Sequence, residues 1–503
     1  MKEYVIGIDI GTSGTKTVLW NVRGQAVSSA TVEYPMAQPQ NGWAEQDPAD
    51  WHRATVETIR KVMRDSGVDP HAVAGIGLSG QMHGLVMLDE RDRVLRPAIL
   101  WCDQRTGAEC AEIEREIGRD RCVAITANPV LTGFTAGKIR WVRKHEPEIF
   151  RKCRRILLPK DYVRLLLTGE YATEVSDASG MQLLDVPKRA WSDVMCDALS
   201  VRADMLGRVY ESPDVTGVLT ESAAAACGLV AGIPVVGGAG DNAAAAVGMG
   251  VVTEGAAFTT IGTSGVVFAH TDRPVIDPAG RVHTFCCAVP GAWHVMGVTQ
   301  GAGLSLRWFR DTLCSPADFD GADPYTWMTA QAEKSPVLAN RLFYLPYLMG
   351  ERTPHLNPDA RGVFFGLSGI HQKGDMIRSV LEGVAFSLTD CLTVLHEMKV
   401  RLDTMRICGG GGKSALWRQI LADCYRMPVC RMENEEGPAL GVGILAMVGG
   451  GLYPDVVTAC REIVRVRDRT DVSENAARYG MGYALYRRLY PALRNEFAAL
   501  AAL

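Results

Sequence analysis

Short apolar segments that end in glycine turns alternate along the chain with amphipathic segments of helical length. We expect strands at residues 5–11, 73–80, 233–240 and 405–412. We expect amphipathic helices at residues 49–65, 104–117 and 413–425. Strands and helices that alternate in this way predict an α/β fold with a mostly parallel sheet.

The sequence Gly-Thr-Ser-Gly occurs twice, at residues 11–14 and 262–265. Each copy lies between two apolar segments, so each predicts a β-hairpin with a glycine turn. Similar hairpins half a chain apart predict a duplicated domain, although two common glycine turns could also coincide by chance. A length of 503 residues indicates two domains of about equal size or three smaller ones, because single hydrophobic cores stop growing near ~250–300 residues. We place these domains at residues 1–248 and 249–503.

Composition and charge exclude several classes of protein. A hydrophobic fraction of 47% and a charged fraction of 22% are ordinary for a globular protein. The net charge of −4 offers no basic surface to nucleic acid or to an anionic membrane, so we expect neither partner. No segment reaches the ~20 consecutive apolar residues that a membrane span needs.

The cysteines and the first residues of the chain predict a cytoplasmic protein. The N-terminal apolar stretch is short and interrupted by Asp9, unlike a signal peptide. The fourteen cysteines are scattered and include no C-x-x-C pair, which is typical of reduced thiols. The adjacent Cys286 and Cys287 predict core packing, because two thiols cannot complete a zinc site.

The two Gly-Thr-Ser-Gly turns are candidate phosphate sites. Glycine lets the backbone approach an anion closely, and backbone N–H groups and neighbouring hydroxyls supply donors. The candidate nucleotide contacts are Thr12, Ser13, Thr15 and Lys16 at the first turn, with Gly262 and Thr263 at the second.

Asp9 stands directly before the first of these turns. A carboxylate there would repel a phosphate unless a magnesium ion lay between them, with water completing the bridge. We therefore predict Asp9 as a water-mediated Mg²⁺ ligand. The alternative is a structural aspartate that bonds to backbone N–H groups of the turn.

Four consecutive glycines at residues 409–412 precede a predicted helix. They do not form a Walker A loop, because Ile407 stands where that pattern requires glycine. A strand, glycines and a helix start instead suit the close approach of an adenosine group. The candidate adenosine contacts are Gly411, Gly412, Ser414 and Trp417.

Asp241 follows a predicted strand and opens an alanine-rich stretch, which places it at a helix N-terminus. Ligands bind at this carboxyl edge of α/β sheets, and the preceding glycines leave the carboxylate accessible. The helix dipole favours the ionised form that a proton acceptor requires. The alternative is a helix N-cap without a chemical role. Asn242, its neighbour, is a candidate sugar contact.

Two further segments carry groups suited to a sugar. Imidazole and amide groups both donate to and accept from hydroxyls, although an isolated histidine is more often a satisfied core group. The candidates directly after strand 73–80 are Gln81, Met82 and His83. A sugar pocket also needs an aromatic face for C–H groups and convergent polar groups. The candidates for that wall are Trp101, Asp103 and Arg105.

Two long patterns resemble the signatures of the FGGY carbohydrate kinases, within the superfamily of actin and hexokinase. The first is GFTAGKIRWV at residues 133–142, and the second is GVFFGL at residues 362–367, continued by Asp375, Met376 and residues 379–382. The resemblance runs over nearly the whole chain. It implies an α/β fold of two duplicated ribonuclease-H-like domains, as in actin-like ATPases, with a cleft between them.

Within that family the chain resembles the subgroup that phosphorylates D-xylulose. The matching segments are SGQMHG at residues 79–84, LPKDY at 158–162, residues 238–243 and GERTPH at 350–355. The resemblance implies ATP with Mg²⁺ as donor and D-xylulose 5-phosphate as product. It also implies Asp241 as proton acceptor, Met82 and His83 at the sugar, and Asp9 as a carboxylate needed for activity.

One departure and several alternatives accompany this resemblance. Lys413 stands where similar kinases tend to have arginine, so contacts on the adenine side can differ. The alternatives are a related kinase for another sugar such as ribulose, a sugar sensor without catalysis, and an actin-like structural protein. A homodimer is common among similar proteins, but no stretch of this sequence identifies a contact surface for one.

Overall fold

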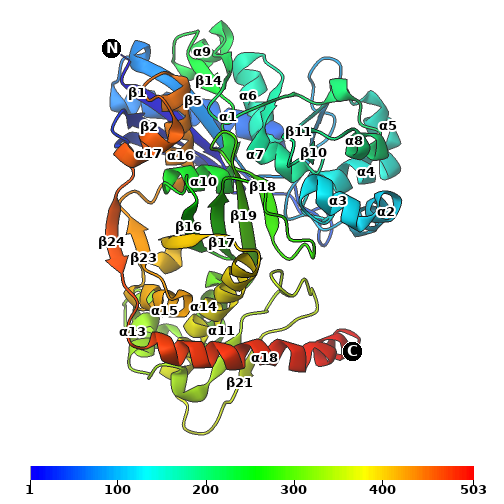
Figure 1. Ribbon diagram of the computed structural model, residues 1–503. Helices are drawn as coiled ribbons and strands as arrows, with labels where there is room; N and C mark the ends of the chain where they lie inside the picture. Colours follow the sequence, from blue (N-terminus) through cyan, green and yellow to red (C-terminus); the bar gives the residue numbers. More distant parts are fainter. Residues whose placement is uncertain (1) are drawn as a thin grey trace.

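Two seven-stranded sheets form the centres of two lobes in the computed structural model, which describes residues 2–503 (Figure 1). The first sheet has the order β13-β14-β5-β1-β2-β3 with β15 beside β5. Its strands are β1 (Tyr4–Ile10), β2 (Gly14–Asn21), β3 (Ala26–Glu33), β5 (Val73–Gly80), β13 (Val215–Val218), β14 (Pro234–Val236) and β15 (Ala239–Gly240). The second sheet has the order β18-β19-β17-β16-β22-β23-β24. Its strands are β16 (Gly255–Ile261), β17 (Gly265–Thr271), β18 (His283–Cys286), β19 (Trp293–Thr299), β22 (Leu402–Cys408), β23 (Val429–Met432) and β24 (Val466–Thr470).

The two sheets share a central strand order, β3-β2-β1-β5-β14 in the first and β19-β17-β16-β22-β23 in the second, which confirms the predicted duplication. Strands β1 and β2 form an antiparallel hairpin around the first Gly-Thr-Ser-Gly turn, and β16 and β17 form the same hairpin around the second. In each sheet the first hairpin strand then pairs in parallel with a later central strand, β5 or β22. Chance similarity of two glycine turns does not produce this shared order.

The prediction of mostly parallel sheets is wrong. Pairs β1–β2, β2–β3 and β13–β14 are antiparallel in the first sheet, as are β16–β17, β17–β19, β18–β19 and β23–β24 in the second. Strands joined by short turns must run antiparallel, whereas parallel pairs need a crossover of a dozen residues or more. Each lobe begins with such short turns, so only its central pairs are parallel.

The predicted helices form close to their expected bounds as α1 (Pro48–Ser66), α2 (Gly107–Ile117) and α15 (Ala415–Tyr425). The Asp47 side chain caps α1 by accepting from the N–H of Ala49, and Ser414 caps α15 by accepting from the N–H of Trp417. Helix α1 covers one face of the first sheet, and α14 (Lys373–Glu397) with α15 covers one face of the second. None of the helices among residues 2–503 is both long and apolar enough to cross a membrane.

Further elements complete both lobes. In the first lobe they are β4 (Glu45–Gln46), β6 (Val86–Leu88), β7 (Ala98–Ile99), α3 (Arg119–Thr126), α4 (Thr135–His145), α5 (Pro147–Lys152), β8 (Arg155–Leu157), α6 (Pro159–Thr168), β9 (Ala172–Glu174), α7 (Val175–Ala178), β10 (Leu184–Asp185), β11 (Ala190–Trp191), α8 (Asp193–Leu199), β12 (Arg208–Tyr210), α9 (Glu221–Cys227) and α10 (Asp241–Gly248). In the later half they are α11 (Gly303–Leu313), α12 (Pro316–Phe319), α13 (Pro324–Glu333), β20 (Phe343–Leu345), β21 (Val363–Phe365), α16 (Gly437–Gly449), α17 (Val456–Ile463) and α18 (Ala476–Ala501). Short 3₁₀ turns lie at Pro70–Ala72, Ser179–Met181, Ala203–Met205, Ala339–Arg341 and Gly410–Lys413.

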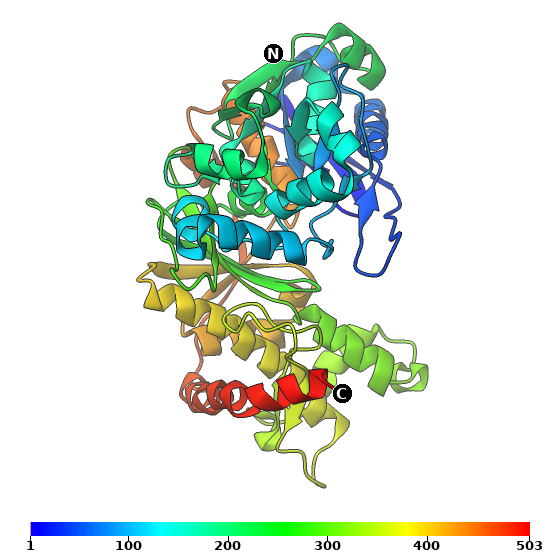
Figure 2. The same ribbon diagram turned by 90° about the vertical axis from the view of Figure 1, so that its right-hand side faces the viewer.

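Helix α16 belongs to the later half of the chain but packs against the first sheet, as its orange ribbon among blue strands shows (Figures 1 and 2). The indole N–H of Trp20 on β2 donates to the carbonyl of Ala439 at 3.1 Å. Helices α10 and α16 share a buried cluster that includes Ala243, Ala244 and Leu440. The chain therefore crosses back between the lobes and ties them together.

Cys286 and Cys287 are both buried, which confirms their predicted core role.

Close contact between α16 and the sheet requires glycine on β5. A Cβ added at Gly77 would lie 2.1 Å from the carbonyl oxygen of Val442, so backbone would have to move. We expect Gly77→Ala to lower the free energy of unfolding by about 1–3 kcal/mol in urea titrations, the usual cost of overpacking. Gly107→Ala on α2 is the control, because a Cβ there meets nothing within 4 Å. Equal stabilities of the two variants would contradict this packing.

Candidate active site

The carboxyl ends of three neighbouring strands bring Asp9 and Asp241 to one edge of the first sheet. Asp9 on β1 lies opposite Ser79 of β5, and Ser79 lies opposite Ala239 of β15. Helix α10 begins two residues later with Asp241. The predicted proton acceptor and the predicted metal ligand therefore flank the same central strand.

Asp9 carries a carboxylate oxygen that no other group satisfies. Its Oδ1 atom is buried and has no hydrogen-bond partner among residues 2–503. Burial raises the pKa of Asp9, against the opposing effects of the Ser79 hydroxyl on β5 and, after it, of Lys16 on the neighbouring strand. Lys16 itself forms an ion pair with Glu436, just before α16. An oxygen left without a donor in this position suits a cation.

Asp241 is the first residue of α10, and the N-cap is Gly240. The alternative prediction of an N-cap role for Asp241 is therefore wrong. Its Oδ1 accepts from the backbone N–H and the side-chain Nδ2 of Asn242, at 2.6 and 3.0 Å. Burial, followed by the charge of Asp9, raises the pKa of Asp241 to about 7. These two effects outweigh the helix dipole, which we expected to keep the group ionised.

A carboxyl with a pKa near neutrality is well matched to proton transfer at physiological pH. It exchanges its proton readily, whereas an ordinary exposed aspartate is a weak base. The structure therefore supports a chemical role for Asp241 by its position and its environment. The side-chain amide of Asn242 donates to the Asp241 carboxylate and does not point into an open pocket. A role of Asn242 in sugar binding therefore remains a prediction.

His83 lies in the turn that follows β5, the strand whose Ser79 lies opposite Asp9, and it has one ring nitrogen free. Its Nδ1 donates to the carbonyl of Gly180 at 2.9 Å, which leaves Nε2 without a proton in the neutral ring. Burial lowers the pKa of His83 well below its ordinary value, so the ring stays neutral. Met82 is buried next to Gly240, the residue before Asp241. The predicted sugar segment therefore adjoins the predicted proton acceptor.

Gln81 points toward the first glycine turn rather than an open pocket. Its side chain is buried, donates to Gln46 at 2.9 Å and accepts from the Thr12 hydroxyl at 3.3 Å. Trp101 remains 42% exposed and donates to the same hydroxyl of Thr12 at 2.9 Å. Trp101 can therefore offer its ring to a ligand, whereas the prediction of Gln81 as a direct sugar contact is not supported by its contacts.

Asp103 and Arg105 are wrongly predicted as pocket residues. Both side chains are buried, and the guanidinium forms ion pairs with Asp103 at 2.6 Å and Glu45 at 2.7 Å. The same guanidinium stacks on Trp43 at 3.6 Å. Each charge is thus neutralised inside the lobe, and Asp103 also accepts from the backbone N–H of Ala44. The polar groups of Asp103 and Arg105 are therefore engaged inside the lobe.

Of the residues predicted at the first phosphate turn, Ser13 is exposed and Thr12 is half-buried. Thr15 is fully buried, and its hydroxyl faces Tyr34 at 3.3 Å, so the prediction of Thr15 as a nucleotide contact is wrong. The Tyr34 hydroxyl donates to the carbonyl of Gly11 at 2.6 Å and fixes the turn. Thr263 of the second turn is exposed.

The second lobe contains a cavity of about 740 Å³ that brings most of the predicted adenosine contacts together. Predicted residues along its wall are Gly262, Thr263, Gly411, Ser414 and Trp417. Gly412 is buried and does not line it, whereas Lys413 does. The opposite wall comes from α11 and α13 and was not predicted: Arg307, Asp323, Tyr325, Thr326, Thr329 and Glu333. Nothing in the local sequence links these residues to the glycine run.

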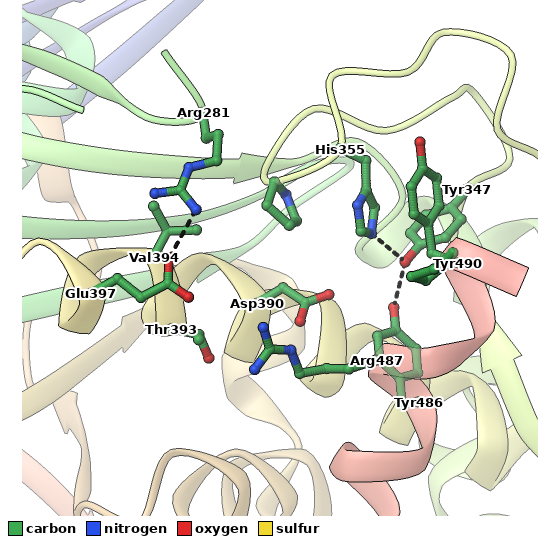
Figure 3. A pocket seen from close by; sticks show the side chains of 12 residues that line it. Arg281, Tyr347, His355, Asp390, Thr393, Val394, Glu397, Tyr486, Arg487 and Tyr490 are labelled. Atoms are coloured by element: carbon green, nitrogen blue, oxygen red, sulfur yellow. Dashed lines mark hydrogen bonds and ion pairs between the residues drawn. The ribbon is translucent and has the colours of Figure 1, made fainter. Parts of the chain in front are cut away.

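A second cavity of about 280 Å³ lies between α14 and α18, away from the predicted site residues (Figure 3). The Tyr347 hydroxyl sits between His355 and Tyr486 there, at 3.2 and 3.1 Å. Arg281 pairs with Glu397 across its other end. Its polar groups are thus largely engaged with one another.

A buried ion cluster supports the segment that leads into Asp241. Lys160 is fully buried and lies 2.8–3.2 Å from the carboxylates of Asp161, Glu174 and Asp177. Glu174 accepts from the Ser176 hydroxyl, whose oxygen accepts in turn from the N–H of Gly240 at 3.1 Å. The sequence signal for this cluster was the LPKDY segment at residues 158–162, which contains Lys160 and Asp161.

Comparisons with known proteins identify the family. Residues 4–248 match the N-terminal domain, and residues 257–450 the C-terminal domain, of the FGGY family of carbohydrate kinases. The chain belongs to that family. The two-lobed α/β architecture of this FGGY kinase is accordingly that of the actin-like ATPases, as predicted.

Relatives of this FGGY kinase cover nearly its whole length. It is 41% identical over 489 residues to a xylulose kinase of Escherichia coli (strain K12), covering 97% of this chain and 99% of the relative. It is 38% identical over 499 residues to a xylulose kinase of Bacillus subtilis (strain 168), covering 99% of both chains. The crystal structure of a xyloylose kinase from Brucella ovis superposes with a TM-score of 0.92 at 37% identity, covering 97% of this chain and 99% of that one.

The raised pKa of Asp241 makes a prediction for the stability of the ligand-free FGGY kinase. The folded protein keeps a proton on Asp241 up to about pH 7, whereas the unfolded chain loses it near pH 3.8. The contribution of this carboxyl to stability therefore falls as the pH rises from about 4 to about 7. We expect Asp241→Asn to melt about a few degrees above the parent at pH 8, with a smaller difference at pH 5.

The control is Asp65→Asn on α1, because Lys61 and Arg64 lower the pKa of Asp65 and keep it ionised throughout this range. Its effect on melting temperature should not change between pH 5 and pH 8. An Asp241→Asn difference that is equally independent of pH would show that Asp241 titrates like an exposed aspartate.

Proposed function

We propose that this FGGY kinase transfers the γ-phosphoryl group of ATP to the terminal hydroxyl of D-xylulose, with D-xylulose 5-phosphate and ADP as products. The relatives that cover nearly its whole length are xylulose kinases. The observation that carries the proposal is the carboxyl of Asp241, whose pKa is raised to about 7. This carboxyl follows Gly240, which packs on Met82 of the proposed sugar turn, and it lies at the same sheet edge as Asp9, just before the first glycine turn. A sensor or a structural protein has no use for such a group.

The sugar would bind at the turn that contains Met82 and His83. The unprotonated Nε2 of His83 accepts a hydrogen bond from a sugar hydroxyl, because Nδ1 is committed to Gly180. The exposed ring of Trp101 offers a flat face to the C–H groups of the sugar. Asn242 holds the Asp241 carboxylate and is a further candidate for a sugar hydroxyl.

The nucleotide would extend from the second-lobe cavity to the two glycine turns. A volume of about 740 Å³ accommodates an adenosine, with Trp417 and Gly411 along one wall and Lys413 beside them. Backbone N–H groups of the turns at residues 11–14 and 262–265, with the hydroxyls of Thr12, Ser13 and Thr263, suit the phosphates.

The donor set of this site fits magnesium rather than a metal held by protein alone. No group of three or more histidine, cysteine, aspartate or glutamate side chains among residues 2–503 could enclose a metal ion. Mg²⁺ is ordinarily held by one or two carboxylates together with phosphate oxygens and water, and the orphaned Oδ1 of Asp9 supplies such a ligand. When bound, Mg²⁺ neutralises charge on the phosphates.

Asp241 is the residue that handles the proton. Its carboxylate accepts the proton of the terminal hydroxyl as the new oxygen–phosphorus bond forms and the bond to the ADP oxygen breaks. Because phosphoryl transfer depends mainly on position and charge, the turns and His83 contribute by holding both substrates in line. The hydrogen bonds from Asn242 aim the carboxylate.

Sugar selectivity and the proton-acceptor role can be tested together. We expect ADP release to be most efficient with D-xylulose in a panel that includes ribulose, gluconate and glycerol. We expect Asp241→Asn to lower kcat by about 10²–10⁴-fold, because general-base help is lost, with little change in KM. Asp65→Asn is the control and should keep full activity. A higher kcat/KM with another sugar would reject D-xylulose, and full turnover of Asp241→Asn would reject its role.

The metal role of Asp9 has a separate test. We expect Asp9→Asn to raise the Mg²⁺ concentration that gives half-maximal activity by about tenfold or more, since an amide is a weaker ligand than a carboxylate. The titration is carried out at saturating ATP and sugar. An unchanged magnesium requirement would leave Asp9 with a structural role only.

A further inference from the structure

His83 has a backbone conformation that needs external support. Its φ of +68° lies in the left-handed region, which residues other than glycine rarely adopt. The ring is fixed on one side by the bond from Nδ1 to Gly180, and a Cβ at Gly180 would lie 2.3 Å from that nitrogen. Phe134 packs against the other side, with ring centroids 4.5 Å apart.

Two side chains of helix α4 hold the backbone of this turn. The carbonyl oxygen of His83 accepts from the Thr135 hydroxyl at 3.0 Å and from the Lys138 ammonium at 3.1 Å. Both donors lie near the start of α4, one turn apart, so they approach the carbonyl from the same helix face. The turn that presents the imidazole is thus bonded to α4.

Lys138 binds more than the His83 carbonyl. Its Nζ also donates to the carbonyls of Gly133 at 2.5 Å and Phe134 at 3.1 Å. Three carbonyls therefore match the three hydrogens of an ammonium group. The amine fixes the backbone of His83 and the backbone of Phe134, whose ring packs on the imidazole.

The environment makes this lysine unusual. Its side chain is fully buried and forms no ion pair with any residue of the described chain. Burial lowers the pKa of Lys138 to about 7, against the opposing effect of Asp103. A buried ammonium is costly, and α4 is already anchored by the buried side chains of Ala136, Ile139 and Val142. Holding the helix in place does not require it.

We propose that Lys138, together with Thr135, is a positioning residue for the sugar, which holds His83 in its left-handed turn so that Nε2 faces the acceptor substrate. This inference rests on the proposed function of the His83 turn. It assigns a role to the lysine of the first family signature, for which the sequence alone indicated none. Lys138 acts through His83 and does not itself reach the reacting atoms.

The test compares Lys138→Met and Thr135→Val with two matched variants. Lys144→Met on the exposed side of α4 removes a lysine that pairs with Glu112, and Thr135→Ser keeps the hydroxyl. We expect Lys138→Met to raise KM for D-xylulose by about tenfold or more, and Thr135→Val by about twofold to fivefold, with KM for ATP unchanged. Lys144→Met and Thr135→Ser should match the parent enzyme.

A spectroscopic measurement separates positioning from general loss of structure. ¹⁵N NMR of the imidazole should show Nδ1 protonated in the parent enzyme, and a mixture of tautomers in Lys138→Met once the turn relaxes. A folded Lys138→Met with parental KM for the sugar would overturn the proposal, as would equal losses in both KM values. If Lys138→Met fails to fold, Thr135→Val decides alone, and a parental KM there overturns the proposal.

The positioning role of Lys138 can be tested whichever sugar the enzyme phosphorylates. If D-xylulose is a poor substrate, the proposed function fails, and the same KM comparison is made with whichever panel sugar the parent enzyme phosphorylates best. A rise in KM confined to that sugar would still support Lys138 as a positioning residue.

Discussion

Two carboxylates that repel each other, Asp9 and Asp241, lie at the same edge of the first sheet, and the rest of the site is arranged around them. Burial and mutual repulsion keep a proton on Asp241 up to about pH 7. Positive charge beside Asp9 would reduce that repulsion and lower the pKa of Asp241. Binding of the proposed Mg²⁺ at Asp9 would therefore act on the ionisation of Asp241 through electrostatics alone.

The fold places the proposed sites for the two substrates, the sugar and the nucleotide, in different lobes. The turn proposed for the sugar and both aspartates belong to the first lobe, whereas the cavity proposed for the adenosine belongs to the second. Helix α10, which begins with Asp241, packs on α16 from the later half of the chain. Hydrogen bonds from the Asn128 amide to the carbonyl of Thr284 and from the N–H of Cys286 to the Ser179 hydroxyl join the two halves of the chain elsewhere. The α10–α16 contact thus ties the helix that begins with Asp241 to the later half of the chain.

Features set by local sequence could be predicted, and features set by distant partners could not. The two hairpins follow from glycine turns between apolar segments, and the strand–glycine–helix unit at residues 402–425 follows from its own sequence. Thr15 was misjudged although the alternation of side chains along β2 turns it inward, beside Tyr34. Asp103 and Arg105 were misjudged because Glu45 and Trp43, which bury them, lie some sixty residues earlier. The α13 wall of the cavity was missed for the same reason.

The most direct measurement is a crystal structure of the protein with D-xylulose, Mg²⁺ and a nonhydrolysable ATP analogue. The account predicts the Asp241 carboxylate within hydrogen-bond reach, about 2.6–3.2 Å, of the terminal sugar hydroxyl, with that hydroxyl directed at the γ-phosphorus. A complex in which Asp241 contacts neither substrate, or in which the sugar lies away from the His83 turn, would contradict it.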